Sequence, residues 1–154
     1  MSAESRITAL IPHREPFLWV DRIVATTDRS IVTEKDIPAD LDVFKGHYPD
    51  HPILPGVLLC EAVFQTGALL SAQMDSGNTP QGQDRMPVVT RIGGARFKRP
   101  VLPGDTIRMN VELTETVSSV CFYKGTVRVN DKVALKIEFA TTLADSGKKN
   151  QTTL

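Results

Sequence analysis

Residues 56–74 read GVLLCEAVFQTGALLSAQM. This stretch has no proline, and apolar residues lie on nearly all sides of the helix that it predicts. A helix that is apolar all round is normally buried inside a protein. Pro55 comes directly before the stretch and suits a helix start, because the first N–H groups of a helix have no partners within it. The stretch therefore predicts one long buried helix at the centre of the fold.

The segments around this helix predict strands. Segments rich in β-branched or alternating apolar residues are 18–25, 30–37, 87–97, 106–117, 119–129 and 132–143. Asn130-Asp131 is a plausible hairpin turn between the last two. Residues 38–55 contain four prolines and predict irregular chain, and the polar residues 75–86 predict a loop. The predicted class is α+β, with a long antiparallel sheet that must wrap round the helix to bury it.

Length and composition indicate one globular domain over residues 1–144, followed by a polar tail at 145–154. Lys and Arg total 18, as do Asp and Glu, and this zero net charge argues against a general nucleic-acid binder. The chain has no continuous apolar run of transmembrane length and no apolar core near its N-terminus, so we expect a cytoplasmic protein without a membrane span. Cys60 and Cys121 are expected to be buried free thiols.

Glu61 and Gln65 are long polar residues within the apolar helix. They are four residues apart, so they lie on one helix face, one above the other. A buried carboxylate is costly unless it is paired, hydrogen-bonded or protonated. Glu61 is therefore a candidate acid–base group. The alternative is a glutamate that bonds to a backbone N–H or an arginine and contributes only to stability.

The loop before the helix supplies a possible partner for Glu61. His47 and His51 have the four-residue spacing of a helical metal pair, but Pro49 and Pro52 forbid a helix here, so we expect no metal site. His47 is instead a candidate base, and His51 is expected to be structural. Gly56 opens the helix, where free backbone N–H groups could hold a carbonyl oxygen that gains charge. Such a set suits proton abstraction next to a carbonyl, followed by loss of a β-leaving group.

Three blocks of this sequence carry a family resemblance. They are 47–65 (HYPDHPILPGVLLCEAVFQ), 11–22 (IPHREPFLWVDR) and 95–105 (ARFKRPVLPGD). In this order, they closely resemble the (3R)-hydroxyacyl-acyl-carrier-protein dehydratases of bacterial type II fatty-acid synthesis, the FabZ family. The resemblance covers residues 7 to 143 and implies the hotdog fold, a curled antiparallel sheet around a long central helix.

The resemblance also implies roles for the candidate residues. His47 would remove the C2 proton of the 3-hydroxyacyl thioester, and Glu61 would help the C3 hydroxyl to leave as water. Gly56 would hold the thioester carbonyl through its N–H, and Gln65 would orient the carboxylate. In the family, the histidine and glutamate of one site come from the two subunits of a dimer, and trimers of dimers are common. The implied partner is acyl carrier protein with its phosphopantetheine-linked acyl chain, and the chemistry needs no cofactor or metal.

A local basic cluster could dock that acidic carrier. Its members are Arg96, Lys98 and Arg99, and a solvated strand end is the alternative interpretation.

The sequence departs from the family at three places. Asp50 stands where the family usually has glycine, which would matter if the position needed a positive φ or if its charge weakened His47 as a base. Trp19 is bulkier than the usual aliphatic residue, and the loop 75–86 is long for the family. Two alternative functions therefore remain, a hotdog thioesterase and a non-catalytic acyl-thioester-binding paralogue.

Overall fold

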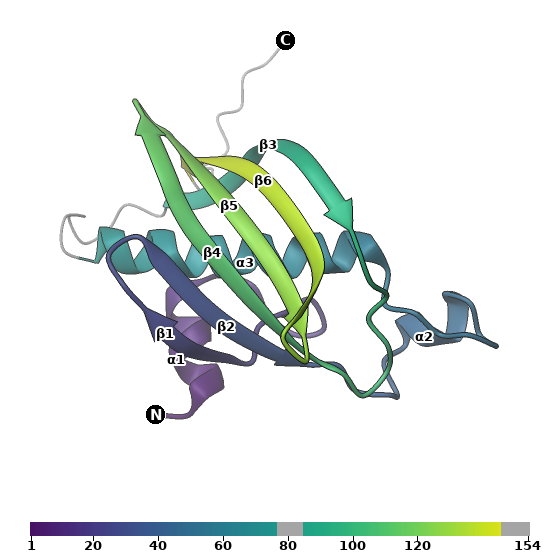
Figure 1. The fold of residues 1–154 in the computed structure, drawn as a ribbon. Coiled ribbons are helices and arrows are strands. Elements are labelled where there is room, and N and C mark those ends of the chain that lie inside the picture. Colours follow the sequence, from purple (N-terminus) through teal and green to yellow (C-terminus); the bar gives the residue numbers. More distant parts are fainter. Residues whose placement is uncertain (77–84, 146–154) are drawn as a thin grey trace, which may run out of the picture.

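The apolar helix lies at the centre of the fold. In the computed structural model, which describes residues 1–76 and 85–145, helix α3 (Gly56–Asp75) runs across the concave side of a curled sheet (Figure 1). Its bounds agree with the predicted helix to within one residue. Pro55, with φ of −54°, precedes the first turn and places no capping side chain on it. The α+β class and the wrapped sheet are thus confirmed.

Six strands form one antiparallel sheet in the order β1-β2-β4-β5-β6-β3. They are β1 (Arg22–Thr26), β2 (Ser30–Asp36), β3 (Arg85–Phe97), β4 (Thr106–Val117), β5 (Val120–Val129) and β6 (Lys132–Asp145). The turn between β5 and β6 has φ of 49° at Asn130 and 64° at Asp131. Asn and Asp tolerate this left-handed region, so the predicted hairpin turn is confirmed.

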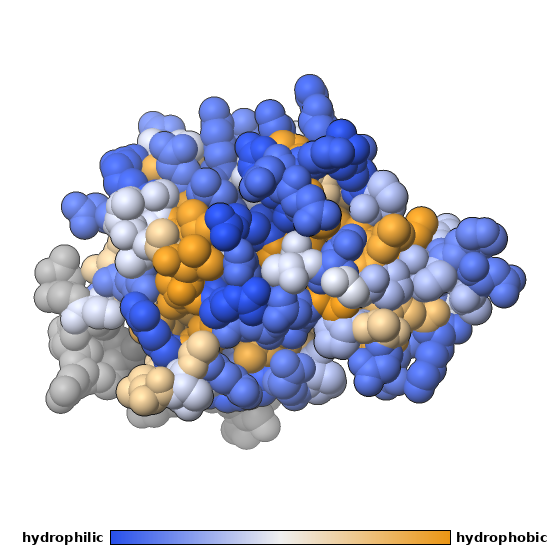
Figure 2. Space-filling model, turned by 60° about the horizontal axis from the view of Figure 1, so that its bottom comes forward, coloured by the Kyte–Doolittle hydropathy of each residue, from blue (hydrophilic) through white to orange (hydrophobic). Residues whose placement is uncertain are grey.

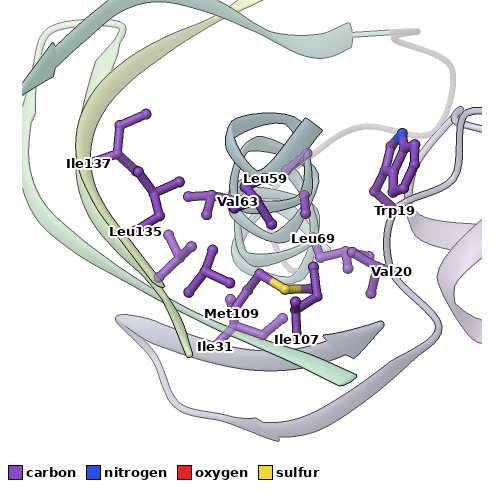
Figure 3. Packing of buried hydrophobic residues seen from close by; sticks show 14 of the residues in the cluster. Trp19, Val20, Ile31, Leu59, Val63, Leu69, Ile107, Met109, Leu135 and Ile137 are labelled. Atoms are coloured by element: carbon purple, nitrogen blue, oxygen red, sulfur yellow. The ribbon is translucent and has the colours of Figure 1, made fainter. Parts of the chain in front are cut away.

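Several predicted boundaries were wrong. The first strand begins at Arg22 instead of residue 18, because Leu18, Trp19 and Val20 are buried in the core without pairing to a strand. Figure 3 shows Trp19 and Val20 beside α3, opposite Ile137 and Leu135 of the sheet. β3 begins at Arg85, inside the predicted loop, and β6 continues to Asp145, one residue into the predicted tail. The rest of that loop and tail, residues 77–84 and 146–154, lies outside the described residues.

Two short helices were not predicted. Helix α1 (Ala3–Leu10) is capped by Ser2, whose side chain accepts a hydrogen bond of 3.1 Å from the Ser5 N–H, and it buries Ile7. Helix α2 (Val43–Gly46) is a single turn in the proline-rich segment and buries Phe44. In Figure 1, α2 projects beyond the end of the molecule at which α3 begins.

The core fills the space between α3 and the sheet. Alternate residues of β4 point inward, and these are Ile107, Met109, Val111 and Leu113. They face the buried side of α3, as Figure 3 shows for Ile107 and Met109. Thr33 and Thr66 place two hydroxyls in this core: Thr66 donates to the Ala62 carbonyl at 2.8 Å and accepts from Thr33 at 2.7 Å, so both protons are used. The same alternation that predicted the strands therefore also identifies their buried faces.

The N-terminal half of α3 is less buried than its composition predicts. Val57 is 74% exposed, while Cys60, Glu61 and Phe64 are half-buried. Cys60 and Cys121 are free, as expected, but both are only half-buried. Helix α3 is long and apolar enough to pass as a membrane span by composition, yet more than half of it is buried in the fold. The sheet of one chain thus covers one side of this helix and leaves an apolar strip beside Glu61 uncovered.

Strand β3 forms an edge of the sheet. It is 13 residues long, and its Val88, Ile92 and Phe97 side chains are exposed. Figure 2 shows one face of the molecule, on which apolar patches lie between hydrophilic ones. A long edge strand with exposed apolar side chains is an available surface for pairing with another strand.

Candidate active site

Glu61 and Gln65 lie together on α3, as their spacing predicts. The Gln65 Nε2 group donates a hydrogen bond of 2.9 Å to Oε1 of Glu61. Two backbone groups fix the Gln65 amide: its Oε1 accepts from the Trp19 N–H at 2.8 Å, and its Nε2 donates to the Phe17 carbonyl at 2.9 Å. Because an N–H can only donate and a carbonyl can only accept, the amide has one possible orientation. Gln65, only 1% exposed, therefore always presents an N–H to Glu61.

His13 is a second neighbour of Glu61. Its Nε2 lies 3.7 Å from Oε1 of Glu61, and its Nδ1 is buried without a hydrogen-bond partner. Burial lowers the pKa of His13 below the ordinary 6.5, the charge of Glu61 opposes this effect, and the charge of Arg14 adds to it. Burial is the largest of these effects, so the fold favours the neutral His13 ring.

His47 follows α2 and is held by the backbone of the next turn. Its Nδ1 lies 2.7 Å from the Ile53 carbonyl oxygen. A carbonyl oxygen only accepts, so Nδ1 carries the proton and Nε2 has a free lone pair. A neutral ring with an unprotonated Nε2 can act as a base. Tyr48 packs against His47, with ring centroids 4.5 Å apart, and itself has a positive φ of 56°.

The start of α3 opens onto a hollow. A cavity of about 470 Å³ is lined by residues that include Gly56, Leu59, Ile53, Phe97, Lys98 and Arg99. A Cβ at Gly56 would lie 2.7 Å from the Phe97 ring, so glycine is needed for this close packing. The first backbone N–H groups of α3 have no partner within the helix. The hollow therefore combines apolar walls, two cations and backbone donors.

The predicted site residues form separate groups. Glu61 and Gln65 are joined, and Gly56, Lys98 and Arg99 line one hollow. No hydrogen bond or ion pair joins His47 to Glu61 within residues 1–76 and 85–145. Arg96 lines a different cavity, of about 700 Å³, with residues of β4, β5 and β6.

Asp50 does not occupy the positive-φ position considered from the sequence. It is exposed, it is absent from the residues with positive φ, and it makes no ion pair with His47 in the described structure. The positive φ belongs to Tyr48, two residues earlier. Among the described residues, no three His, Cys, Asp or Glu side chains gather as a metal site would need.

A family model described as the FabA-like domain matches residues 11–138. The chain belongs to the FabA-like family. Within this family, it is 41% identical over 146 residues to the 3-hydroxyacyl-[acyl-carrier-protein] dehydratase FabZ of Caulobacter vibrioides, covering 94% of this chain and 90% of the relative. It is 38% identical over 130 residues to the FabZ of Clostridium perfringens, covering 84% and 90%.

Solved structures agree on the fold of this FabA-like chain. The dehydratase heterocomplex ApeI:P of Xenorhabdus doucetiae matches with a TM-score of 0.76, 13% identity and 91% coverage of both chains. The PaaI protein of the E. coli phenylacetic acid degradation operon matches with a TM-score of 0.63, 15% identity and coverage of 91% and 88%. The predicted hotdog fold is confirmed.

His13 is the site residue that the sequence interpretation missed. It lies within the block 11–22 that carries the resemblance, between Pro12 and Arg14. The one feature of the sequence that could have pointed to His13 is its position inside a block that resembles the family. Its contact with Glu61 joins residues far apart in the sequence, so no local spacing could reveal it.

Proposed function

We propose that this chain is a hydro-lyase that converts (3R)-3-hydroxyacyl-acyl carrier protein into trans-2-enoyl-acyl carrier protein in type II fatty-acid synthesis. The proposal is carried by the Glu61 carboxylate. Gln65 donates a hydrogen bond to one of its oxygens, and the helix that carries both residues begins at a cavity with apolar walls. Its relatives at about 40% identity bear the name of this activity.

The proposed reaction assigns one proton transfer to His47 and one to Glu61. The Nε2 of His47 has a free lone pair, so it takes the C2 proton of the substrate. Glu61, in its protonated form, gives its proton to the C3 hydroxyl, which leaves as water as the C2–C3 double bond forms. The N–H of Gly56, at the positive end of α3, donates a hydrogen bond to the thioester oxygen, on which negative charge develops. Transfer of the proton from His47 back to Glu61 through solvent restores the starting state.

The proposed dehydration is tested by incubating the protein with 3-hydroxybutyryl-acyl carrier protein, and the reverse hydration with crotonyl-acyl carrier protein. The loss or gain of the mass of one water is followed in each case. We expect reversible hydration, and we expect His47→Ala and Glu61→Gln each to lose about 100-fold or more in kcat. Release of free carrier thiol would favour the thioesterase instead. Binding of intact acyl carrier protein without chemistry would favour a non-catalytic paralogue.

We further propose that the active unit is a dimer, alone or in trimers of dimers, with each site shared between two subunits. Three features support this assembly. The edge strand β3 has exposed apolar side chains, the Val57 side of α3 is exposed, and no hydrogen bond or ion pair joins His47 to Glu61 within the described part of the chain. A second copy would cover both apolar surfaces and could bring its own His47 to this Glu61.

Mixed dimers test the shared site. The inactive variants His47→Ala and Glu61→Gln are co-expressed so that their subunits combine at random. A dimer of one of each keeps one complete site if His47 and Glu61 come from different subunits. Half of the dimers are mixed and each has one of two sites active, so we expect about a quarter of wild-type activity. Activity no higher than that of either variant alone would show that the site lies within one chain.

Lys98 and Arg99 support a docking role for the hollow. Both line the cavity at the start of α3, where an acidic carrier would have to place its phosphopantetheine arm. Arg96 lines the other cavity and has no part in this proposal. The free thiols of Cys60 and Cys121 and the carrier-linked substrate favour the cytoplasm as the site of action.

A further inference from the structure

The loop that carries His13 is held rigidly against α3. The Arg14 guanidinium donates hydrogen bonds to three backbone carbonyls, those of Thr8 at 3.0 Å, Ile11 at 2.8 Å and His13 at 2.7 Å. These bonds fix the turn after α1. Further along the chain, the Phe17 carbonyl and the Trp19 N–H are hydrogen-bonded to the Gln65 side chain. His13 therefore reaches Glu61 from a segment that is anchored on both sides.

The surroundings of the ring select one protonation form. A proton on Nδ1 would leave a buried donor without a partner and would turn the lone pair of Nε2 toward a carboxylate oxygen. A proton on Nε2 places a donor opposite Glu61 and leaves only an unpaired acceptor buried at Nδ1. Orphaned buried donors are the rarer and costlier of the two. The doubly protonated ring would also bury an orphaned donor, so the neutral form protonated at Nε2 fits best.

Gln65 and His13 both face the same oxygen of Glu61. Gln65 bonds to Oε1 at 2.9 Å, and Nε2 of His13 lies 3.7 Å from that same atom. Within the described residues, no group donates to Oε2. A contact of 3.7 Å is longer than a hydrogen bond, and catalytic contacts of this kind often tighten only when substrate binds.

We propose that His13 is a positioning residue that, as a neutral imidazole with its proton on Nε2, holds Oε1 of Glu61 together with Gln65. Oε2 is then the oxygen that carries the proton to the substrate hydroxyl. When that proton leaves, the two N–H groups stabilise the carboxylate that remains. This inference rests on the proposed dehydratase function, because it assigns a role in that reaction.

Two substitutions at position 13 separate positioning from simple structure. His13→Gln keeps an N–H donor at a similar reach, and His13→Leu removes it. We expect His13→Leu to lower kcat by about 10- to 100-fold, since a hydrogen bond to a charged group is lost, with KM changed by less than about threefold. His13→Gln should recover most of the kcat. The exposed His51, substituted by Gln, is the matched control and should have the wild-type kcat.

The outcomes are distinct. A wild-type kcat in His13→Leu overturns the inference, and so does an equal loss in both variants accompanied by an equal fall in Tm, which would indicate a structural role alone. If the wild-type protein shows no dehydration, the proposed function itself fails.

A second measurement does not depend on activity or on a folded variant. Long-range ¹⁵N–¹H NMR of histidine-labelled wild-type protein shows which ring nitrogen carries the proton, and the chain has only 3 histidines to assign. We expect opposite tautomers near neutral pH, with the proton on Nε2 in His13 and on Nδ1 in His47. A proton on Nδ1 of His13, alone or in a charged ring, overturns the inference.

Discussion

At the scale of single residues, Gln65 joins two parts of the chain that would otherwise meet only through apolar packing. Its amide bonds to the backbone at Phe17 and Trp19 and to the carboxylate of Glu61. Part of this arrangement was predictable, because residues four apart on a helix share a face whatever the rest of the fold does. The contact of His13 was not predictable, because it depends on how the turn after α1 folds back on α3.

Substitution of Gln65 is expected to affect both stability and catalysis. Gln65→Leu leaves the buried Trp19 N–H without an acceptor, which should lower the free energy of unfolding by about 1–3 kcal/mol. It also removes a donor from Glu61, so kcat should fall. Urea unfolding and steady-state kinetics measure the two effects. Glu61→Gln is the comparison, and it should lose kcat with little loss of stability; equal stability in both variants would contradict the role of Gln65 as an anchor.

The lowered pKa of His13 makes stability depend on pH. The folded protein favours the neutral ring, so as the pH falls below 6.5 the unfolded chain takes up a proton first. The stabilisation is present above pH 6.5 and is lost progressively below it, until the folded His13 is protonated as well.

We therefore expect wild type to lose more unfolding free energy than His13→Gln between about pH 7.5 and about pH 5.5. Urea unfolding at one fixed protein concentration measures this, and parallel losses in the two proteins would contradict it. The other two histidines are common to both proteins and cancel in the comparison.

At the scale of elements, the long helix and the long strands were predictable because their apolar periodicity extends over many residues. Helices α1 and α2 were missed for a physical reason, since helices this short are stabilised by caps and tertiary contacts more than by their own composition. The start of β1 was misplaced because buried irregular chain at Leu18 and Val20 is as apolar as a strand. The sheet and α3 also pack closely at three glycines, Gly56, Gly67 and Gly125, which the composition does not reveal.

The approach of β5 to α3 gives a prediction at this scale. A Cβ at Gly125 would overlap with Cγ1 of Val63, which is fully buried in the core. Gly125→Ala should therefore lower the free energy of unfolding by about 1–3 kcal/mol, as overpacking typically does. Gly46→Ala is the matched control, because nothing lies within 4 Å of a Cβ there. Urea unfolding of the two variants should differ clearly, and equal midpoints would show that the helix and sheet can separate without cost.

At the scale of the whole molecule, the basic residues that are close in sequence serve two different surfaces. Lys98 and Arg99 line the hollow at the start of α3, whereas Arg96 lies within β3 and lines the cavity shared with β4, β5 and β6. The sequence grouped the three because they are neighbours along the chain, whereas in the structure they line two different cavities.

This separation supplies an internal control for carrier docking. The double substitution Lys98→Glu and Arg99→Glu should raise KM for carrier-bound substrate by about 10-fold or more through charge repulsion, and should spare a small thioester mimic. Arg96→Glu should raise KM much less. Steady-state kinetics with both substrates measures this, and an equal loss on carrier-bound and small substrates would refute docking at this hollow.

The bonds of Gln65 to main-chain atoms also bear on how this sequence can change over time. Backbone N–H and carbonyl groups are present whatever side chains residues 17 and 19 have, so these two bonds do not depend on the tryptophan at position 19. Exchanges of side chain in this segment leave the anchor intact. An insertion or deletion of one residue there would shift both backbone partners away from the Gln65 amide. This segment should therefore tolerate substitutions but no change in its length.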